Sequence, residues 1–255
     1  MLQRWFKTIV KKYIDKDKRM KKYVLLIVGT LLVLVGCNRV QTGGRESDEA
    51  LTAFNAIVKA NPDRKGYHDA LKHWGLALPE GAKFEWTKDT GANNIDFAMV
   101  IPAEPFIQAG LDVNRLDGTG YVFQAAKVEG GESLPDLLLH PYNVSDKKQN
   151  AQGSEDALRR ILKQKNNMVK YHGELQHYRL FLYDEGDTPF EVQWTEELGL
   201  SDADITFVIP ADPLTAAGLD ITRLDGWVFQ PASNDNSMGM GANPNQLVEI
   251  YTLVN

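Results

Sequence analysis

The sequence contains a single cysteine, Cys37, among its 255 residues. One cysteine excludes a disulfide within the chain and a cysteine-rich zinc site. Positive charge is not in excess either, because 28 Lys and Arg stand against 34 Asp and Glu, so nucleic acid is not an expected partner. With 43% hydrophobic and 24% charged residues, the composition is that of a globular protein with one large or two small domains.

Signatures of catalysis are missing as well. The sequence has no Gly-x-Ser-x-Gly turn, no His-Glu-x-x-His pair, no phosphate-binding loop and no dinucleotide-binding glycine pattern. Two of the many Asp and Glu residues could act as the acid and base of a cell-envelope hydrolase, and this alternative stays open. We expect binding rather than catalysis, and no cofactor.

Long apolar runs are limited to one, near the N-terminus. Residues 1–23 carry nine Lys or Arg and two Asp, whereas the residues after Cys37 carry 19 basic and 32 acidic side chains. The basic start leads directly into the 13 apolar residues Val24–Gly36. This length is typical of a signal-peptide core and shorter than the ~20 residues of a membrane-spanning helix.

The apolar run ends in Leu34-Val35-Gly36-Cys37, which resembles the lipobox of bacterial lipoproteins. The resemblance implies that signal peptidase recognises Leu34, Val35 and Gly36, that it cuts before Cys37, and that the Cys37 thiol carries diacylglycerol. Residues 1–36 would be a signal peptide, with Met20 as an alternative start, and residues 37–46 a lipidated tether. The expected location is extracytoplasmic, anchored by lipid to a bacterial membrane.

The remainder of the chain repeats itself. Ser47–Leu51 recurs as Ser154–Leu158, Tyr67–Trp74 as Tyr171–Tyr178, Trp86-Thr87 as Trp194-Thr195, Ile101–Gly118 as Ile209–Gly226, and Val122–Gln124 as Val228–Gln230. The offset between matching residues stays between 104 and 108. This order of matches predicts two tandem homologous modules, 47–146 and 154–255, joined by the polar linker 147–153.

Each module is predicted to be α+β, in the order α-α-β-β-α-β-β, with about 100 residues and a core of its own. Ser47 and Ser154 are suitable N-caps for a first helix. Tyr67, Leu71 and Trp74 recur at helical spacing, as do their counterparts Tyr171, Leu175 and Tyr178, and predict a second helix. Alternating apolar residues predict the strands, and the segments Pro105–Gly110 and Pro213–Gly218 predict a short helix.

Four histidines, His68, His73, His172 and His177, are equivalent between the repeats. Imidazoles are good ligands for transition metals, so a four-histidine site between the modules is one hypothesis. Histidines five residues apart on a helix, however, are separated by about 140° around its axis. We therefore favour the interpretation that they flank the buried aromatic residues.

Two equivalent loops contain an Asp-x-x-Arg-x-Asp-Gly pattern, at Asp112–Gly118 and Asp220–Gly226. Arg115 and Leu116 occupy positions where a calcium loop needs oxygen ligands, so we do not expect calcium binding. The pattern is instead typical of a turn capped by the first Asp, with a local Arg pair and a tight Asp-Gly turn into the next strand.

The repeats differ most before the last strand, where Ser237, Met238, Gly239 and Met240 form a loop of Met and Gly. Methionine makes adaptable apolar contacts, so this loop is a candidate surface for a ligand or an envelope protein; a hairpin loop without function is the alternative. Altogether the sequence predicts a membrane-anchored binding protein or envelope-interaction protein.

Overall fold

The structure is a computed structural model that describes residues 45–69, 71–90, 95–129, 132–143, 149–164, 168–182, 190–200, 202–233 and 244–253. It combines helices with antiparallel sheets, so the α+β prediction is confirmed. Apart from the turn at 173–175, these residues belong to one compact unit. Among them, no helix is both long and apolar enough to cross a membrane.

Two six-stranded sheets carry the fold. The first sheet has the order β1 (Lys65–His68), β2 (His73–Ala77), β3 (Lys83–Thr87), β5 (Phe97–Pro102), β9 (Leu137–Tyr142) and β6 (Val122–Gln124). The second has the order β11 (Val169–His172), β12 (His177–Leu182), β13 (Phe190–Thr195), β14 (Ile205–Pro210), β16 (Gln246–Tyr251) and β15 (Val228–Gln230). In each sheet, the strand that comes last in the chain lies between the strands that come fourth and fifth: β9 between β5 and β6, and β16 between β14 and β15.

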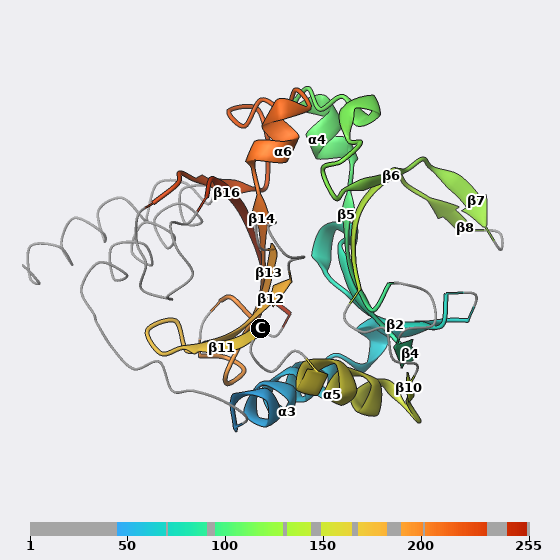
Figure 1. Ribbon diagram of the computed structural model, residues 1–255, viewed down its shortest axis with the longest axis vertical. Helices are drawn as coiled ribbons and strands as arrows, with labels where there is room; N and C mark the ends of the chain where they lie inside the picture. The colour runs from blue at the N-terminus through green and yellow to red at the C-terminus, as the bar shows by residue number, and fades with distance from the viewer. Residues whose placement is uncertain are drawn as a thin grey trace, which may run out of the picture. The chain divides into compact units, whose positions relative to one another are not determined.

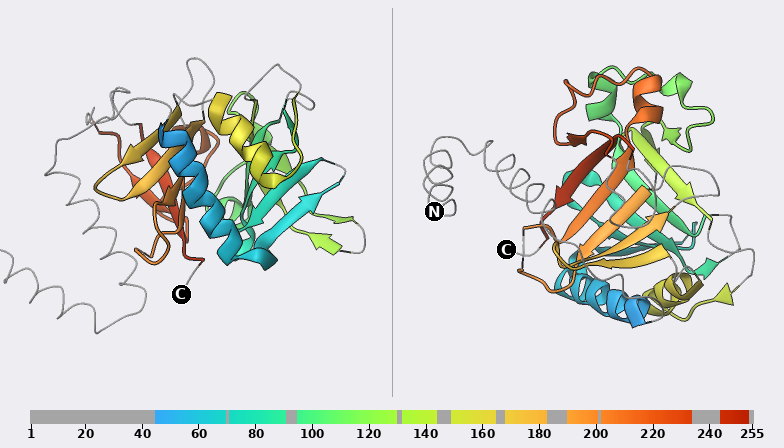
Figure 2. Two further views of the ribbon diagram at one scale, coloured as in Figure 1. Left: turned by 90° about the horizontal axis from the view of Figure 1, so that it is seen from below. Right: turned by 60° about the vertical axis from the view of Figure 1, so that its left-hand side comes forward.

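Shorter elements surround the sheets. These are the helices α3 (Arg45–Ala60), α4 (Glu104–Gln108), α5 (Ser154–Gln164) and α6 (Asp212–Ala216), the single 3₁₀ turns η1 (Pro62–Arg64), η2 (Pro79–Gly81) and η3 (Val113–Arg115), and the strand pairs β4 (Asp89–Thr90) with β10 (Gln149–Asn150) and β7 (Lys127–Glu129) with β8 (Glu132–Leu134). The two sheets face each other, with α3 and α5 at one end and α4 and α6 at the opposite end (Figure 1). Seen from below, α3 and α5 lie side by side (Figure 2).

One hydrophobic core fills the space between the sheets, rather than one core in each repeat. Phe54 of α3 contacts Trp86 of the first sheet and Trp194 of the second, with ring centroids 5.7 and 5.5 Å apart. The Trp86 indole N–H donates to the Ser154 carbonyl of α5 at 3.0 Å, and the Trp194 indole N–H donates to the Ala50 carbonyl of α3 at 2.9 Å. Each large helix thus packs on the sheet formed by the other repeat.

The predicted second helix is wrong in both repeats, because those residues form hairpins. Tyr67 pairs with Trp74 across β1 and β2, and Tyr171 pairs with Tyr178 across β11 and β12. A four-residue turn between paired strands also places aromatic residues seven positions apart on one face, so the spacing did not distinguish the two structures. Gly173 within the second of these segments disfavours a helix by about 1 kcal/mol.

The first helix of each repeat is present, although its start differs from the prediction. α3 begins at Arg45, two residues before Ser47, and Ser47 is buried inside the helix. α5 begins at Ser154 itself, and the N–H of Ala157 donates to the carbonyl of Gly153 at 2.9 Å, so Gly153 precedes the first turn.

The Asp-x-x-Arg loops connect the two repeats, because both Arg side chains donate hydrogen bonds across to the other repeat, beyond the local pair that was expected. Arg115 donates through Nη2 to the carbonyl of Ala216 at 2.6 Å, and Arg223 donates in the same way to the carbonyl of Gln108 at 2.7 Å. Both acceptors lie at the end of the other repeat's short helix, where a cation is favoured by the helix dipole. The first Asp of each loop does cap its turn, as predicted: Asp112 accepts from Asn114 N, and Asp220 from Thr222 N, both at 3.0 Å.

Candidate functional site

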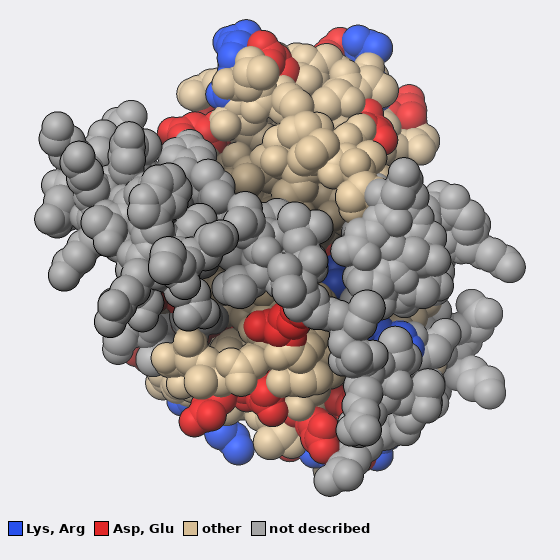
Figure 3. Space-filling view, turned by 90° about the vertical axis from the view of Figure 1, so that its left-hand side faces the viewer, with Lys and Arg blue, Asp and Glu red and all other residues tan. Residues whose placement is uncertain are grey.

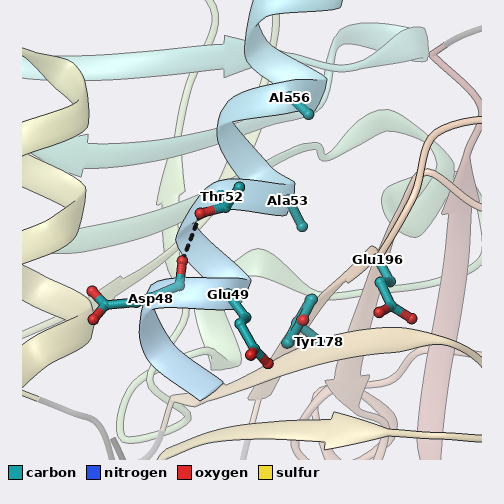
Figure 4. A pocket seen from close by; sticks show the side chains of 7 residues that line it. All are labelled: Asp48, Glu49, Thr52, Ala53, Ala56, Tyr178 and Glu196. Carbon is teal, nitrogen blue, oxygen red and sulfur yellow. Dashed lines mark hydrogen bonds between the residues drawn. The ribbon is translucent and has the colours of Figure 1, made fainter. Parts of the chain in front are cut away.

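A groove of about 530 Å³ lies between the first turns of α3 and the second sheet. It is lined by Asp48, Glu49, Thr52, Ala53, Ala56, Tyr178 and Glu196. The groove exists because α3 crosses from its own repeat to the second sheet, and the small Ala side chains leave space between helix and strands (Figure 4).

Two carboxylates and a phenol ring face this space. Glu49 of α3, Tyr178 of β12 and Glu196, which follows β13, lie on the same side of the helix (Figure 4). The carboxylate of Asp48 points to the opposite side, where it lies 3.9 Å from Arg159 and 3.8 Å from Lys163 of α5. No lysine or arginine is among these seven lining residues.

Burial and acidic neighbours shift the pKa values of groups in and beside the groove. Burial, with Glu49 and Glu196 adding to it, raises the pKa of Tyr178 to about 12. Burial also raises the pKa of the neighbouring Tyr171, whose hydroxyl donates a hydrogen bond to Glu196. The pKa of Glu46 is raised by burial and by Glu49, against the opposing effect of Lys170. Acidic side chains gather over the lower part of this face, the end where α3 and α5 lie (Figure 3).

Four of the seven lining positions have basic counterparts in the other repeat, whereas Asp48 and Glu49 have acidic ones, Glu155 and Asp156. Lys88 follows Trp86-Thr87 as Glu196 follows Trp194-Thr195. The backbone contacts are also equivalent, because the N–H of Lys88 donates to the carbonyl of Lys72 at 2.7 Å and the N–H of Glu196 donates to the carbonyl of Gln176 at 2.8 Å. On the helices, Thr52, Ala53 and Ala56 of α3 correspond to Arg159, Arg160 and Lys163 of α5. These basic side chains distinguish the acidic groove between α3 and the second sheet from the equivalent surface between α5 and the first sheet.

The four candidate histidines lie on hairpins instead of helices. His68 pairs with His73, and His172 with His177, as cross-strand neighbours. The two pairs belong to different sheets, and within the described ranges no group of three or more His, Cys, Asp or Glu could hold a metal ion. His73 instead lies 3.3 Å from Glu85 through Nδ1, and burial lowers the pKa of His177.

Several predicted site residues lie outside the described residues. They are the lipobox residues Leu34, Val35 and Gly36 with Cys37, and the loop residues Ser237, Met238, Gly239 and Met240. For these residues the sequence remains the source of the prediction.

Sequence reasoning missed the groove as a site. Of its lining residues, Tyr178 entered the sequence analysis as part of the predicted second helix, and neither Glu49 nor Glu196 was a predicted site residue. The reversal from Lys88 to Glu196 beside the repeated Trp-Thr pair was the signal that could have drawn attention to it.

Comparison with known proteins adds no family, since no family model, no curated protein and no solved structure matches the chain.

Proposed function

We propose that this chain is an extracytoplasmic lipoprotein, anchored to a bacterial membrane through Cys37, whose body binds a ligand with a cationic group in the acidic groove. The observation that supports the binding role is the placement of Glu49 and Glu196 around Tyr178 in a groove whose described lining residues include no Lys or Arg. Carboxylates and an aromatic face both attract ammonium and guanidinium groups. The lipobox resemblance supports the anchor.

The anchor is tested by replacing the cysteine. We expect Cys37→Ala to abolish incorporation of radiolabelled palmitate in bacterial cells and to leave the uncleaved precursor, because the thiol is the atom that lipid modification alkylates. Ser47→Ala serves as the control and should be labelled and cleaved like the wild type. Undiminished labelling of Cys37→Ala would show that the lipobox resemblance is misleading.

The groove is tested with spermidine as a probe cation, by calorimetry on the chain beginning at Asn38. Glu49→Gln and Glu196→Gln should each weaken binding by roughly tenfold, because each removes one charge-assisted contact. Glu155→Gln is the matched control, since Glu155 occupies the position of Asp48 in the other repeat and does not line the groove. Equal affinity for all three variants would place spermidine elsewhere.

The second candidate function is an envelope hydrolase. One observation favours it, namely that Glu49 and Glu196 line the same groove and could act as a carboxylate pair. Turnover of cell-wall fragments that disappears in both Glu49→Gln and Glu196→Gln would support the hydrolase over a binding role.

We further propose that the two halves are tandem homologous modules that arose by duplication. The matching sequence order, the equal strand order of the two sheets and the reciprocal Arg115 and Arg223 contacts support this origin. The groove would then have arisen after duplication, when the charges of the two copies diverged.

A further inference from the structure

The hairpin of β1 and β2 exposes apolar and basic side chains together. All four residues of β1 are exposed, Tyr67 at 36%, and Leu71 in the turn is 46% exposed. The ring centroids of Tyr67 and Trp74 lie 4.6 Å apart. We call the surface formed by Lys65, Tyr67, Leu71, Trp74 and Lys88 the lysine–aromatic surface.

Cations and rings share this surface in close contact. The Lys65 Nζ lies 5.8 Å from the centre of the Trp74 ring, and the Lys88 Nζ lies 5.9 Å from the centre of the Tyr67 ring. Tyr and Trp prefer the boundary between lipid headgroups and acyl chains, and lysines near that boundary attract anionic headgroups. The combination has the chemistry of a membrane-contacting surface.

The equivalent hairpin of the second repeat shows that the exposure is specific to the first. There the rings of Tyr171 and Tyr178, with centroids 5.1 Å apart, lie in a hairpin that packs against α3. The acidic side chains of Glu49 and Glu196 lie near Tyr178. In the first repeat α5 packs on β3 and β4, and Tyr67 stays exposed. An aromatic pair that one repeat covers with a helix is thus left for another partner in the other repeat.

We propose that the lysine–aromatic surface docks on an anionic lipid bilayer. Charge complementarity supports this partner, because the residues after Cys37 carry 19 basic and 32 acidic side chains, and anionic headgroups repel most of such a body. Contact is favoured at the exposed Lys65 and the half-buried Lys88, which lie beside aromatic rings. Docking would set the orientation of the protein on the membrane.

The dimensions of the chain are compatible with simultaneous anchoring and docking. This step rests on the proposed lipid anchor. Seven residues separate Cys37 from α3 and span about 25 Å when extended. The 16 residues of α3 add about 24 Å, and β1 begins five residues after its end. A lipid on Cys37 would raise the local concentration of the hairpin at the bilayer.

The experiment measures how much of the chain beginning at Asn38 floats with lipid vesicles. This chain contains all described residues of the shared core and no lipid anchor. We expect binding to vesicles of phosphatidylcholine mixed with phosphatidylglycerol and not to phosphatidylcholine alone, with weaker binding at high salt. The double variant Lys65→Gln with Lys88→Gln should lower the partition coefficient by about 25-fold, which corresponds to about fivefold for each lysine. Tyr67→Ser should also lower it.

The matched control is the double variant Lys59→Gln with Lys127→Gln, which removes two exposed lysines from α3 and β7 and should bind like the wild type. Near-ultraviolet circular dichroism of each variant checks that the fold is retained. Equal binding to neutral and anionic vesicles, or unchanged binding of the Lys65 and Lys88 variant, would overturn the proposal. A second result would also overturn it, namely that the wild type associates with itself in sedimentation experiments without vesicles and that the Lys65 and Lys88 variant does not. That result would identify a second copy of the chain as the partner. Because no lipidated cysteine is present, these outcomes are independent of the Cys37 test.

Discussion

Single residues show how the two repeats depend on each other, and His140 is the clearest example. The imidazole lies in β9, is 8% exposed, and is surrounded by the rings of Tyr121, Tyr142 and Phe190. Phe190 belongs to the other sheet, and the Tyr121 hydroxyl donates to the carbonyl of Pro210 there at 3.4 Å. Burial among these groups lowers the pKa of His140 from its ordinary value of 6.5 to about 3.

This pKa predicts that acid destabilises the protein through His140. Between about pH 6.5 and pH 3 the unfolded chain binds a proton at this residue that the folded chain does not. The free energy of unfolding therefore falls by about 1.4 kcal/mol for each unit by which the pH is lowered. Above pH 6.5 the residue contributes no pH dependence. His140→Leu should therefore flatten the pH dependence of stability, measured by urea unfolding between neutral pH and about pH 5.

The exposed His68 provides the control, because His68→Gln removes a histidine from the surface of β1 and should retain the wild-type slope. His177, whose pKa burial also lowers, contributes in the same direction and leaves part of the slope in the His140 variant. If His140→Leu and His68→Gln gave identical slopes, the imidazole would not be the acid-sensitive group.

At the scale of elements, local patterns predicted those features that depend on neighbours in the chain. Alternating apolar residues predicted the strand β5. Phe97, Met99 and Ile101 lie in the shared core, and Ala98 and Val100 on the other face are buried in a second, smaller cluster. Tyr67 and Trp74 misled the prediction, since a helix and a tight hairpin both bring residues seven positions apart together. The exposed Leu71 in the turn is the residue that a buried helical stripe would not tolerate.

The candidate site could not be predicted from local patterns for a different reason. Glu49 and Glu196 are separated by 147 positions, and they meet in one groove because α3 packs on the sheet of the other repeat. That crossing is stabilised by the hydrogen bond from Trp194 to Ala50 and by Phe54 between the two tryptophans. Such contacts follow from the packing of whole elements, which a single sequence does not specify.

At the scale of the whole molecule, the backbones of the two repeats meet at Gly110 and Gly218. The backbones at this contact exchange hydrogen bonds, from Asp112 N to Ala217 O and from Asp220 N to Ala109 O, each at 2.9 Å. A Cβ atom on Gly218 would lie 3.0 Å from the carbonyl oxygen of Gly110, and one on Gly110 would lie 3.1 Å from that of Gly218. Glycine is thus required here both for its left-handed backbone, with φ of 100° and 103°, and for space.

Gly218→Ala should therefore separate the repeats at this end and lower the free energy of unfolding by about 2–4 kcal/mol, as strain in the backbone adds to the overlap. Gly118→Ala is the matched control, because Gly118 has a left-handed φ of 76° and no atom within 4 Å of an added Cβ. Its loss should be limited to about 1 kcal/mol of backbone strain.

Urea unfolding followed by tryptophan fluorescence measures both, since Trp86 and Trp194 are buried in the shared core. Equal losses for the two variants would mean that the contact between the repeats contributes little, whereas a larger loss at Gly218 in a single transition would show that the two repeats unfold together.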